Sequence, residues 1–197
     1  MAPTISCSSA ARAMFALVAL RLLAAPAAAG EVVRRDFPDL VARAEQIVIG
    51  TVTAIREAPD ASGAPETLVT LADLSVLKGE VGPELTLHFY GGQAGGVAVR
   101  IADMPTFTVG ERDVLFVAGN PTAICPLVGI WQGRFSVRFD PALGTEIVED
   151  HAHNPVTGLS PSARRGAQAA SATPMTLDGF RQRIADELAQ PSGTPIP

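Results

Sequence analysis

The three histidines are the residues best suited to metal or acid–base chemistry. Two of them close the run Glu149-Asp150-His151-Ala152-His153. Alternate residues of an extended segment point to the same side, so His151 and His153 could bind one metal ion together. A third ligand such as His88 would have to come from another part of the chain. We treat His151 and His153 as candidate metal ligands, with exposed polar residues beside a linker as the alternative.

Nucleophilic catalysis has less support in the sequence. Cys7 lies in the N-terminal segment, and Cys125 stands between Ile124 and Pro126 with no histidine near it in sequence. We expect Cys125 to be a buried, unreactive thiol. The Gly-x-Ser-x-Gly motif of many hydrolases is absent. The acidic residues lie mostly in predicted turns, where solvated charge is the usual explanation. We therefore expect no catalytic residue and no cofactor.

Arginine and aromatic residues form a second candidate site. Arg100, Arg134 and Arg138 occupy the polar positions of predicted strands, and Tyr90 and Trp131 stand near them in the pattern. Arginine, tyrosine and tryptophan are the residues that most often dominate binding hot spots. We take these five residues as a candidate binding face, with the ordinary polar surface of a sheet as the alternative.

The glycine-rich segment 91–96 invites comparison with phosphate-binding loops. Such loops lead into a helix whose N-terminus meets the anion. Here the alternation of Val97, Val99 and Ile101 with other residues predicts a strand instead. We expect residues 91–96 to connect the strands of a hairpin.

Residues 1–29 have the organisation of an export signal. Arg12 supplies positive charge, residues 13–25 are apolar except for Arg21, and small residues end at Ala29. The apolar run is too short to span a bilayer, which disfavours a membrane anchor. We expect cleavage before Gly30. The protein is then exported, to the periplasm or outside the cell, with no stable membrane insertion.

The composition of the 197 residues is that of a folded domain. Hydrophobic residues make up 47% and charged residues 18% of the chain, which is enough to build a core. The formal net charge of −5 argues against a general nucleic-acid binder. One cysteine remains after residue 29, so no intramolecular disulfide forms and the core must supply the stability.

Residues 30–153 predict a mainly β domain. A short helix begins at Asp36, with an apolar face of Phe37, Leu40, Val41 and Ala44. Strands are expected at 47–55, 67–77, 85–90, 97–101, 113–118, 134–139 and 145–148. Gly50 in the first strand suggests a bulge. Short strands with little helix between them indicate a small antiparallel barrel, closed or half-closed, with a sandwich as the alternative.

The C-terminal part predicts a linker and one helix. Residues 154–174 are rich in Pro, Ser, Gly, Thr and Ala, as flexible linkers are. A helix is expected within residues 175–190, capped by Thr176, with an apolar stripe of Leu177, Phe180, Ile184 and Leu188. An isolated helix of this length is marginal in water. We therefore expect the stripe to dock on the β domain, with a partner protein as the alternative.

The stretch from Ala44 to Asp140 resembles a group of secreted bacterial proteins that are mostly uncharacterised. The residues that carry the resemblance are 45–52 (EQIVIGTV), 76–79 (VLKG), 91–96, 105–111 (PTFTVGE), 114–117 (VLFV) and 128–135 (VGIWQGRF). Such domains are similar to the five-stranded OB-type barrel of tissue inhibitors of metalloproteinases, and some resemble regions that accompany secreted matrixin-type proteases. The resemblance implies a TIMP-like, OB-like barrel and a protein partner such as a protease.

The inhibitory mechanism of that family does not carry over. Those inhibitors chelate the protease zinc through an N-terminal cysteine, whereas the expected mature chain begins at Gly30 and retains only Cys125. We expect an exported, non-catalytic binding module for a protein partner. The alternatives are a protease inhibitor that acts by another route, such as insertion of residues 91–96, and a metal-dependent hydrolase.

Overall fold

The computed structural model describes residues 34–159 and 173–190, so the predicted export signal and most of the predicted linker lie outside the described residues. The elements are α2 (Phe37–Arg43), β1 (Gln46–Pro59), β2 (Pro65–Lys78), β3 (Leu85–Tyr90), β4 (Gly92–Ala94), β5 (Val97–Val99), β6 (Arg112–Val117), the 3-10 helix η1 (Ile130–Gly133), β7 (Arg134–Asp140), β8 (Thr145–Glu149) and α3 (Leu177–Ala189). None of the described helices combines the length and the apolar character needed to cross a membrane.

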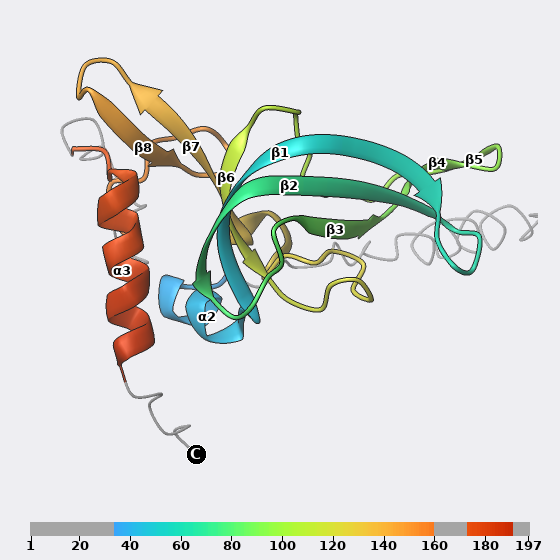
Figure 1. Cartoon of the computed structure of the whole chain (residues 1–197), viewed down its shortest axis with the longest axis horizontal. Coiled ribbons are helices and arrows are strands. Elements are labelled where there is room, and N and C mark those ends of the chain that lie inside the picture. Colours follow the sequence, from blue (N-terminus) through green and yellow to red (C-terminus); the bar gives the residue numbers. More distant parts are fainter. Residues whose placement is uncertain (1–33, 160–172, 191–197) are drawn as a thin grey trace, which may run out of the picture. The chain divides into compact units, whose positions relative to one another are not determined.

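Six strands form one antiparallel sheet in the order β3-β2-β1-β6-β7-β8, and β4 and β5 form a separate hairpin (Figure 1). The predicted mainly β, antiparallel class with two helices is confirmed. The sheet does not close into a barrel, because β3 and β8 are its outer strands and no strand pairing joins them within the described residues.

Both faces of the central strands are buried, because successive side chains of a strand point to opposite faces. On one face, Ile47 and Phe116 pack with the two helices. On the other face, Val48 and Leu115 pack with residues of β2 and β3. The sheet is therefore the middle layer between two apolar clusters.

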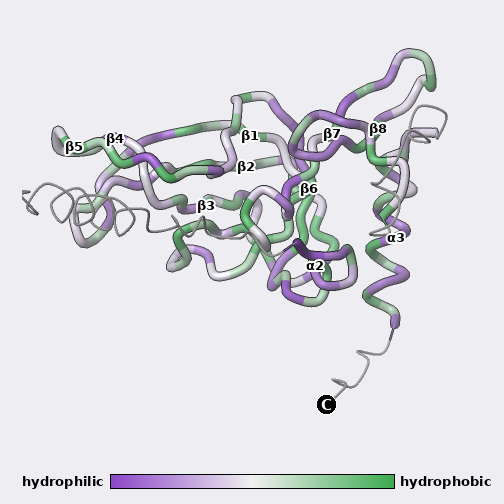
Figure 2. The backbone as a smooth tube through the Cα atoms, turned by 180° about the vertical axis from the view of Figure 1, so that it is seen from behind, coloured by the Kyte–Doolittle hydropathy of each residue, from purple (hydrophilic) through white to green (hydrophobic). Residues whose placement is uncertain are grey.

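Each helix begins at the predicted cap and packs on the first of these faces. The Asp36 carboxylate accepts from the Asp39 N–H at 2.9 Å, and the Thr176 hydroxyl oxygen accepts from the Gly179 N–H at 3.1 Å. Phe180 is fully buried against aromatic rings of α2, β6 and β7. The docking of α3 on the chain's own sheet is thus confirmed, and Figure 2 shows hydrophobic and hydrophilic residues alternating along α3. Its stripe is shorter than predicted, because Leu188 remains 39% exposed.

A bulge in β1 shapes the sheet. The pairing of β1 with β2 shifts register at Gly50, where the sequence predicted an irregularity, but the extra residue there lies on β2: Asp73 and Leu74 stand opposite Gly50 alone. The extra residue on β1 is Thr53, between the pairs Val52–Leu71 and Ala54–Thr70. A Cβ at Gly50 would lie 2.6 Å from Leu74 Cδ2 and 3.3 Å from the Ala72 carbonyl oxygen, so any larger residue would force the Leu74 side chain to move. Pairing of β1 with β6 ends at Thr51, whereas pairing with β2 continues to Pro59. Strands β1 and β2 therefore extend together beyond β6, as Figure 1 shows.

Candidate functional site

A cavity of about 450 Å³ lies on the extension of β1 and β2 beyond β6. It is lined by residues of β1, β2 and β3, by both strands of the β4–β5 hairpin and by residues 100–107. Its volume is within the range of ordinary ligand sites.

The floor of the cavity follows from strand register. Ile55 pairs with Val69, and Glu57 pairs with Thr67, which in turn pairs with Phe89 of β3. Residues that pair directly across antiparallel strands share a face, so all five side chains project to one side. The floor is apolar at Ile55, Val69 and Phe89 and polar at Glu57 and Thr67.

The β4–β5 hairpin crosses this floor because two glycines redirect the chain after β3. Gly91 and Gly92 have φ angles of +108° and +122°. A Cβ at Gly92 would lie 2.8 Å from the Thr67 hydroxyl oxygen, which itself donates to the Gly91 carbonyl at 2.8 Å. The prediction that residues 91–96 only connect the strands of a hairpin is wrong for Gly92–Ala94, which is itself a strand. Strand β5 pairs with β4 and not with β3, so the connection of the hairpin is Gly95 and Gly96.

The opposite wall of the cavity is residues 104–107, which Arg134 holds in place. The Phe107 ring packs against Phe89 with 5.3 Å between centroids, and the Arg134 guanidinium lies 4.2 Å from the centre of the Phe107 ring. Arg134 also donates to the Thr106 carbonyl and forms an ion pair with Glu111 at 2.8 Å. Arg134 is therefore a support for the cavity wall.

A second carboxylate, that of Asp113, also forms an ion pair with Arg134. It is fully buried, with Oδ2 3.1 Å from Arg134 Nη2. Burial raises the pKa of the Asp113 carboxyl, while the Arg134 guanidinium opposes that shift. The prediction that Arg134 lies on a polar outer face is wrong. Arg134 pairs with Leu115 and so shares its buried face, which residues 104–107 cover.

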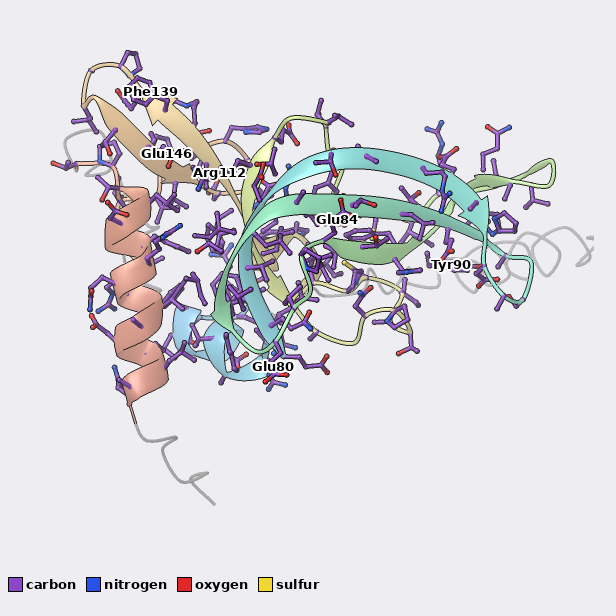
Figure 3. The ribbon with its side chains drawn as sticks, viewed as in Figure 1. Glu80, Glu84, Tyr90, Arg112, Phe139 and Glu146 are labelled. Atoms are coloured by element: carbon purple, nitrogen blue, oxygen red, sulfur yellow. The ribbon has the colours of Figure 1, made fainter. Side chains whose placement is uncertain are left out.

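Two of the predicted binding residues do meet at the cavity. Tyr90, at the end of β3, and Arg100, just after β5, both line it. Tyr90 is 38% exposed, and Figure 3 shows it at the β4 end of the molecule, away from Arg112 and Glu146. A neighbouring hollow of about 100 Å³ is lined by Tyr90, His88 and Glu66, and Glu66 Oε2 lies 2.9 Å from His88 Nδ1.

The other predicted residues gather near the β7–β8 hairpin. The rings of Trp131 and His151 stack with 3.8 Å between centroids. Arg138 Nε and His153 Nδ1 approach the two carboxylate oxygens of Glu149, at 2.7 Å and 3.8 Å. The five predicted binding residues therefore do not form one face.

The candidate metal ligands are not assembled into a site. No group of three or more His, Cys, Asp or Glu side chains with metal-binding geometry occurs in residues 34–159 and 173–190. His88, the suggested third ligand, is paired with Glu66 on β2. Cys125 is half-buried rather than buried, and its partial burial raises the pKa of the thiol, which keeps it protonated and weakly nucleophilic.

Sequence reasoning missed Ile55, Glu57 and Phe107 as site residues. Ile55 is the last residue of the strand predicted at 47–55, Glu57 lies beyond the predicted end of that strand, and Phe107 lies in a segment without periodicity. Strands at 47–55 and 67–77 were predicted, but their pairing was not, and this pairing, which continues to Pro59, forms the floor of the cavity.

No family model matches the sequence, and neither a curated protein nor a solved structure matches it. The cavity and its surroundings therefore carry the functional inference.

Proposed function

We propose that the chain is an exported, non-catalytic binding module that holds part of another exported protein in the cavity over β1, β2 and β3. The observation that carries the proposal is a 450 Å³ cavity whose floor is largely apolar and whose lining includes the polar groups of Glu57, Tyr90 and Arg100. An apolar floor buries one group of a ligand, and a few polar groups fix its orientation.

The chemistry of the lining supports binding more than catalysis. The titratable side chains among the described residues that line the cavity are Glu57, Tyr90 and Arg100. A general acid or base needs a pKa near the working pH. Histidine, whose unperturbed pKa is the nearest to neutrality, is not among the described residues that line the cavity.

Export and the finer fold are parts of the same proposal. Export rests on the charged, apolar and small-residue pattern of residues 1–29. The OB-like barrel is supported by a long β1 with a bulge at Thr53, which pairs with β6 at its start and with β2 along its length. Since β3 and β8 are not paired within the described residues, the proposal is of a half-closed barrel.

The test is capture of partners from the periplasm and culture fluid by the wild-type chain and two tryptophan variants. Ala98 lines the cavity, so Ala98→Trp blocks it. Ala142→Trp is the matched control, because Ala142 is an exposed residue in the β7–β8 turn. A protein that the wild type and Ala142→Trp retain, and that Ala98→Trp loses, is the expected result. Equal capture by all three proteins would overturn the proposal.

A second candidate, inhibition of an exported protease, is favoured by the tip of the β4–β5 hairpin. No atom lies within 4 Å of a Cβ built at Gly95 or Gly96, and Val97 is 54% exposed. Inserting this tip into a protease cleft would inhibit without a zinc-chelating cysteine. Dose-dependent inhibition of a secreted metalloprotease, lost in Val97→Asp, is the expected result, and no inhibition at micromolar concentrations would exclude this route.

A further inference from the structure

We propose that the outer edge of β1, from Thr53 to Ala58, binds an extended peptide segment of the partner as an additional antiparallel strand. The inference rests on the proposed function and deepens it, because it names the form in which the partner binds. An added strand gains affinity from backbone hydrogen bonds and specificity from alternate side chains.

The edge is open because β6 ends early. Val52 is the last residue of β1 with a backbone partner on that side: its N–H donates to the Glu111 carbonyl, and its carbonyl accepts from the Gly110 N–H, both at 2.8 Å. From Thr53 to Ala58, strand β2 is the only strand paired with β1 among the described residues.

Hydrogen-bond alternation identifies the groups that face outward. The Asp60 N–H donates to the Ala64 carbonyl at 2.7 Å, so that pair is hydrogen-bonded. Hydrogen-bonded pairs alternate along an antiparallel ladder. The next such pairs are Ala58–Glu66 and Arg56–Leu68. The N–H and C=O groups of Ile55 and Glu57 therefore point away from β2, toward the open edge.

The other edges of the sheet are covered by the chain itself. On β3, the Asn120 side chain accepts from the His88 N–H at 3.0 Å and donates to the Thr86 carbonyl at 2.9 Å. The Tyr90 N–H donates to the Ile124 carbonyl at 3.0 Å.

The edge of β8 is covered in the same way. The Val148 N–H donates to the Met175 carbonyl, and the Val148 carbonyl accepts from the Val156 N–H. Exposed edges invite uncontrolled pairing with other chains, and proteins usually block them. The chain covers the edges of the outer strands β3 and β8, but within the described residues it leaves the edge of β1 from Thr53 to Ala58 unpaired. This contrast supports the binding of a partner strand at that edge.

The side chains along the edge specify the occupant. Ile55 and Glu57 face the cavity, and Arg56 is exposed on the opposite face. Opposite charges paired across strands stabilise a sheet, and like charges destabilise it. The partner segment should therefore carry a basic residue opposite Glu57, an acidic residue opposite Arg56 and an apolar residue opposite Ile55. Self-pairing of two copies centred on Arg56 or Glu57 would set like charges against each other, which favours a different protein as the occupant.

The test is an NMR titration of the full chain with acetylated peptides built around Thr-Val-Thr-Lys-Glu-Val-Thr-Val, where Lys-Glu-Val aligns with Glu57, Arg56 and Ile55. We expect the amide resonances of Ile55 and Glu57 to shift and their hydrogen exchange to slow. N-methylation of the Val that follows Glu in the peptide, opposite Ile55, should abolish binding, because the N–H of this Val points to β1. N-methylation of the Glu should not, because its N–H points away. No shift at millimolar peptide, or equal binding of the two N-methylated peptides, would overturn the inference.

Charge reversal supplies the matched variants. Glu57→Arg should weaken binding about fivefold, and a peptide with Glu in place of Lys should restore it. Glu80→Arg is the control, because Glu80 is exposed at the other end of β1 and β2 (Figure 3). Unchanged peptide affinity in Glu57→Arg would overturn the assignment of the peptide to this edge. The proposed function would still stand if Ala98→Trp blocked capture of the partner. Protein dimerisation in place of peptide binding would also overturn it.

Discussion

Replacing Arg134 with methionine tests the buried ion pair that supports the cavity wall. Methionine keeps most of the apolar stem but leaves the Asp113 carboxylate, which is fully buried, without its cation. Removing one partner of a buried pair costs about 3–5 kcal/mol. We expect about 3 kcal/mol, at the lower end of that range, because Glu111, the other carboxylate paired with Arg134, is already 35% exposed.

The stability difference between wild type and Arg134→Met should depend on pH, because Arg134 affects the pKa of Asp113. Burial raises the pKa of Asp113 above its ordinary value of 3.8, and Arg134 lowers it. Loss of Arg134 therefore raises the folded-state pKa further. A group whose pKa is raised on folding stabilises the fold at low pH and loses that contribution as pH rises through the folded-state pKa. The stability difference between wild type and Arg134→Met should therefore be largest at pH 7 and shrink as the pH falls.

Urea unfolding of the wild type and the variant at pH 7 and at pH 5 measures this difference. The double variant Asp113→Asn with Arg134→Met should recover part of the loss at pH 7, because no buried charge remains. Arg43→Met is the control and should cost under about 1 kcal/mol, since the Arg43 side chain is 57% exposed in its pair with Asp39. A loss below about 1 kcal/mol for Arg134→Met at pH 7, or the same loss at both pH values, would refute the reasoning.

Three further predictions concern the packing and the turns. Phe180→Ala should lower the free energy of unfolding by about 3–5 kcal/mol, because Phe180 is fully buried. Leu188→Ala, at a position 39% exposed, should cost far less in the same urea titration. Asn120→Ala should cost about 1–3 kcal/mol and promote aggregation seen by light scattering, because it uncovers β3. Gly79→Ala should lower the melting temperature more than Gly63→Ala. Both glycines have positive φ, but a Cβ at Gly79 would lie 2.5 Å from the Glu45 carbonyl oxygen, whereas Gly63 has open space.

Local patterns predicted most of the elements, because those elements depend on neighbouring residues. The Asp36 and Thr176 caps, the register shift at Gly50 and the change of chain direction at Gly91 all follow from the chemistry of one or two positions. Strand ends were less accurate: β1 continues to Pro59, beyond the predicted end at 55. That extension depends on pairing with β2, which a pattern along one strand does not contain.

The candidate site was harder to predict because its parts meet only in three dimensions. Arg134 alternates with apolar residues along the strand, and this alternation predicted an exposed position for it. Its burial depends on residues 104–107, which cover that face without forming a helix or strand. The cavity likewise joins β1 to a loop about fifty residues later in the chain, and no spacing rule links Ile55 with Phe107.

Asn120, whose side-chain amide covers the β3 edge, also affects the chemical stability of the protein over time. Asparagine deamidates when the backbone nitrogen of the next residue attacks the side-chain carbonyl, closes a five-membered ring and expels ammonia. The next residue here is Pro121, whose nitrogen is already bonded to three carbons and has no proton to lose. The amide that substitutes for a strand is therefore shielded from this slow hydrolysis. The hydrogen bonds by which Asn120 covers the β3 edge therefore do not decay through this reaction as the folded chain ages.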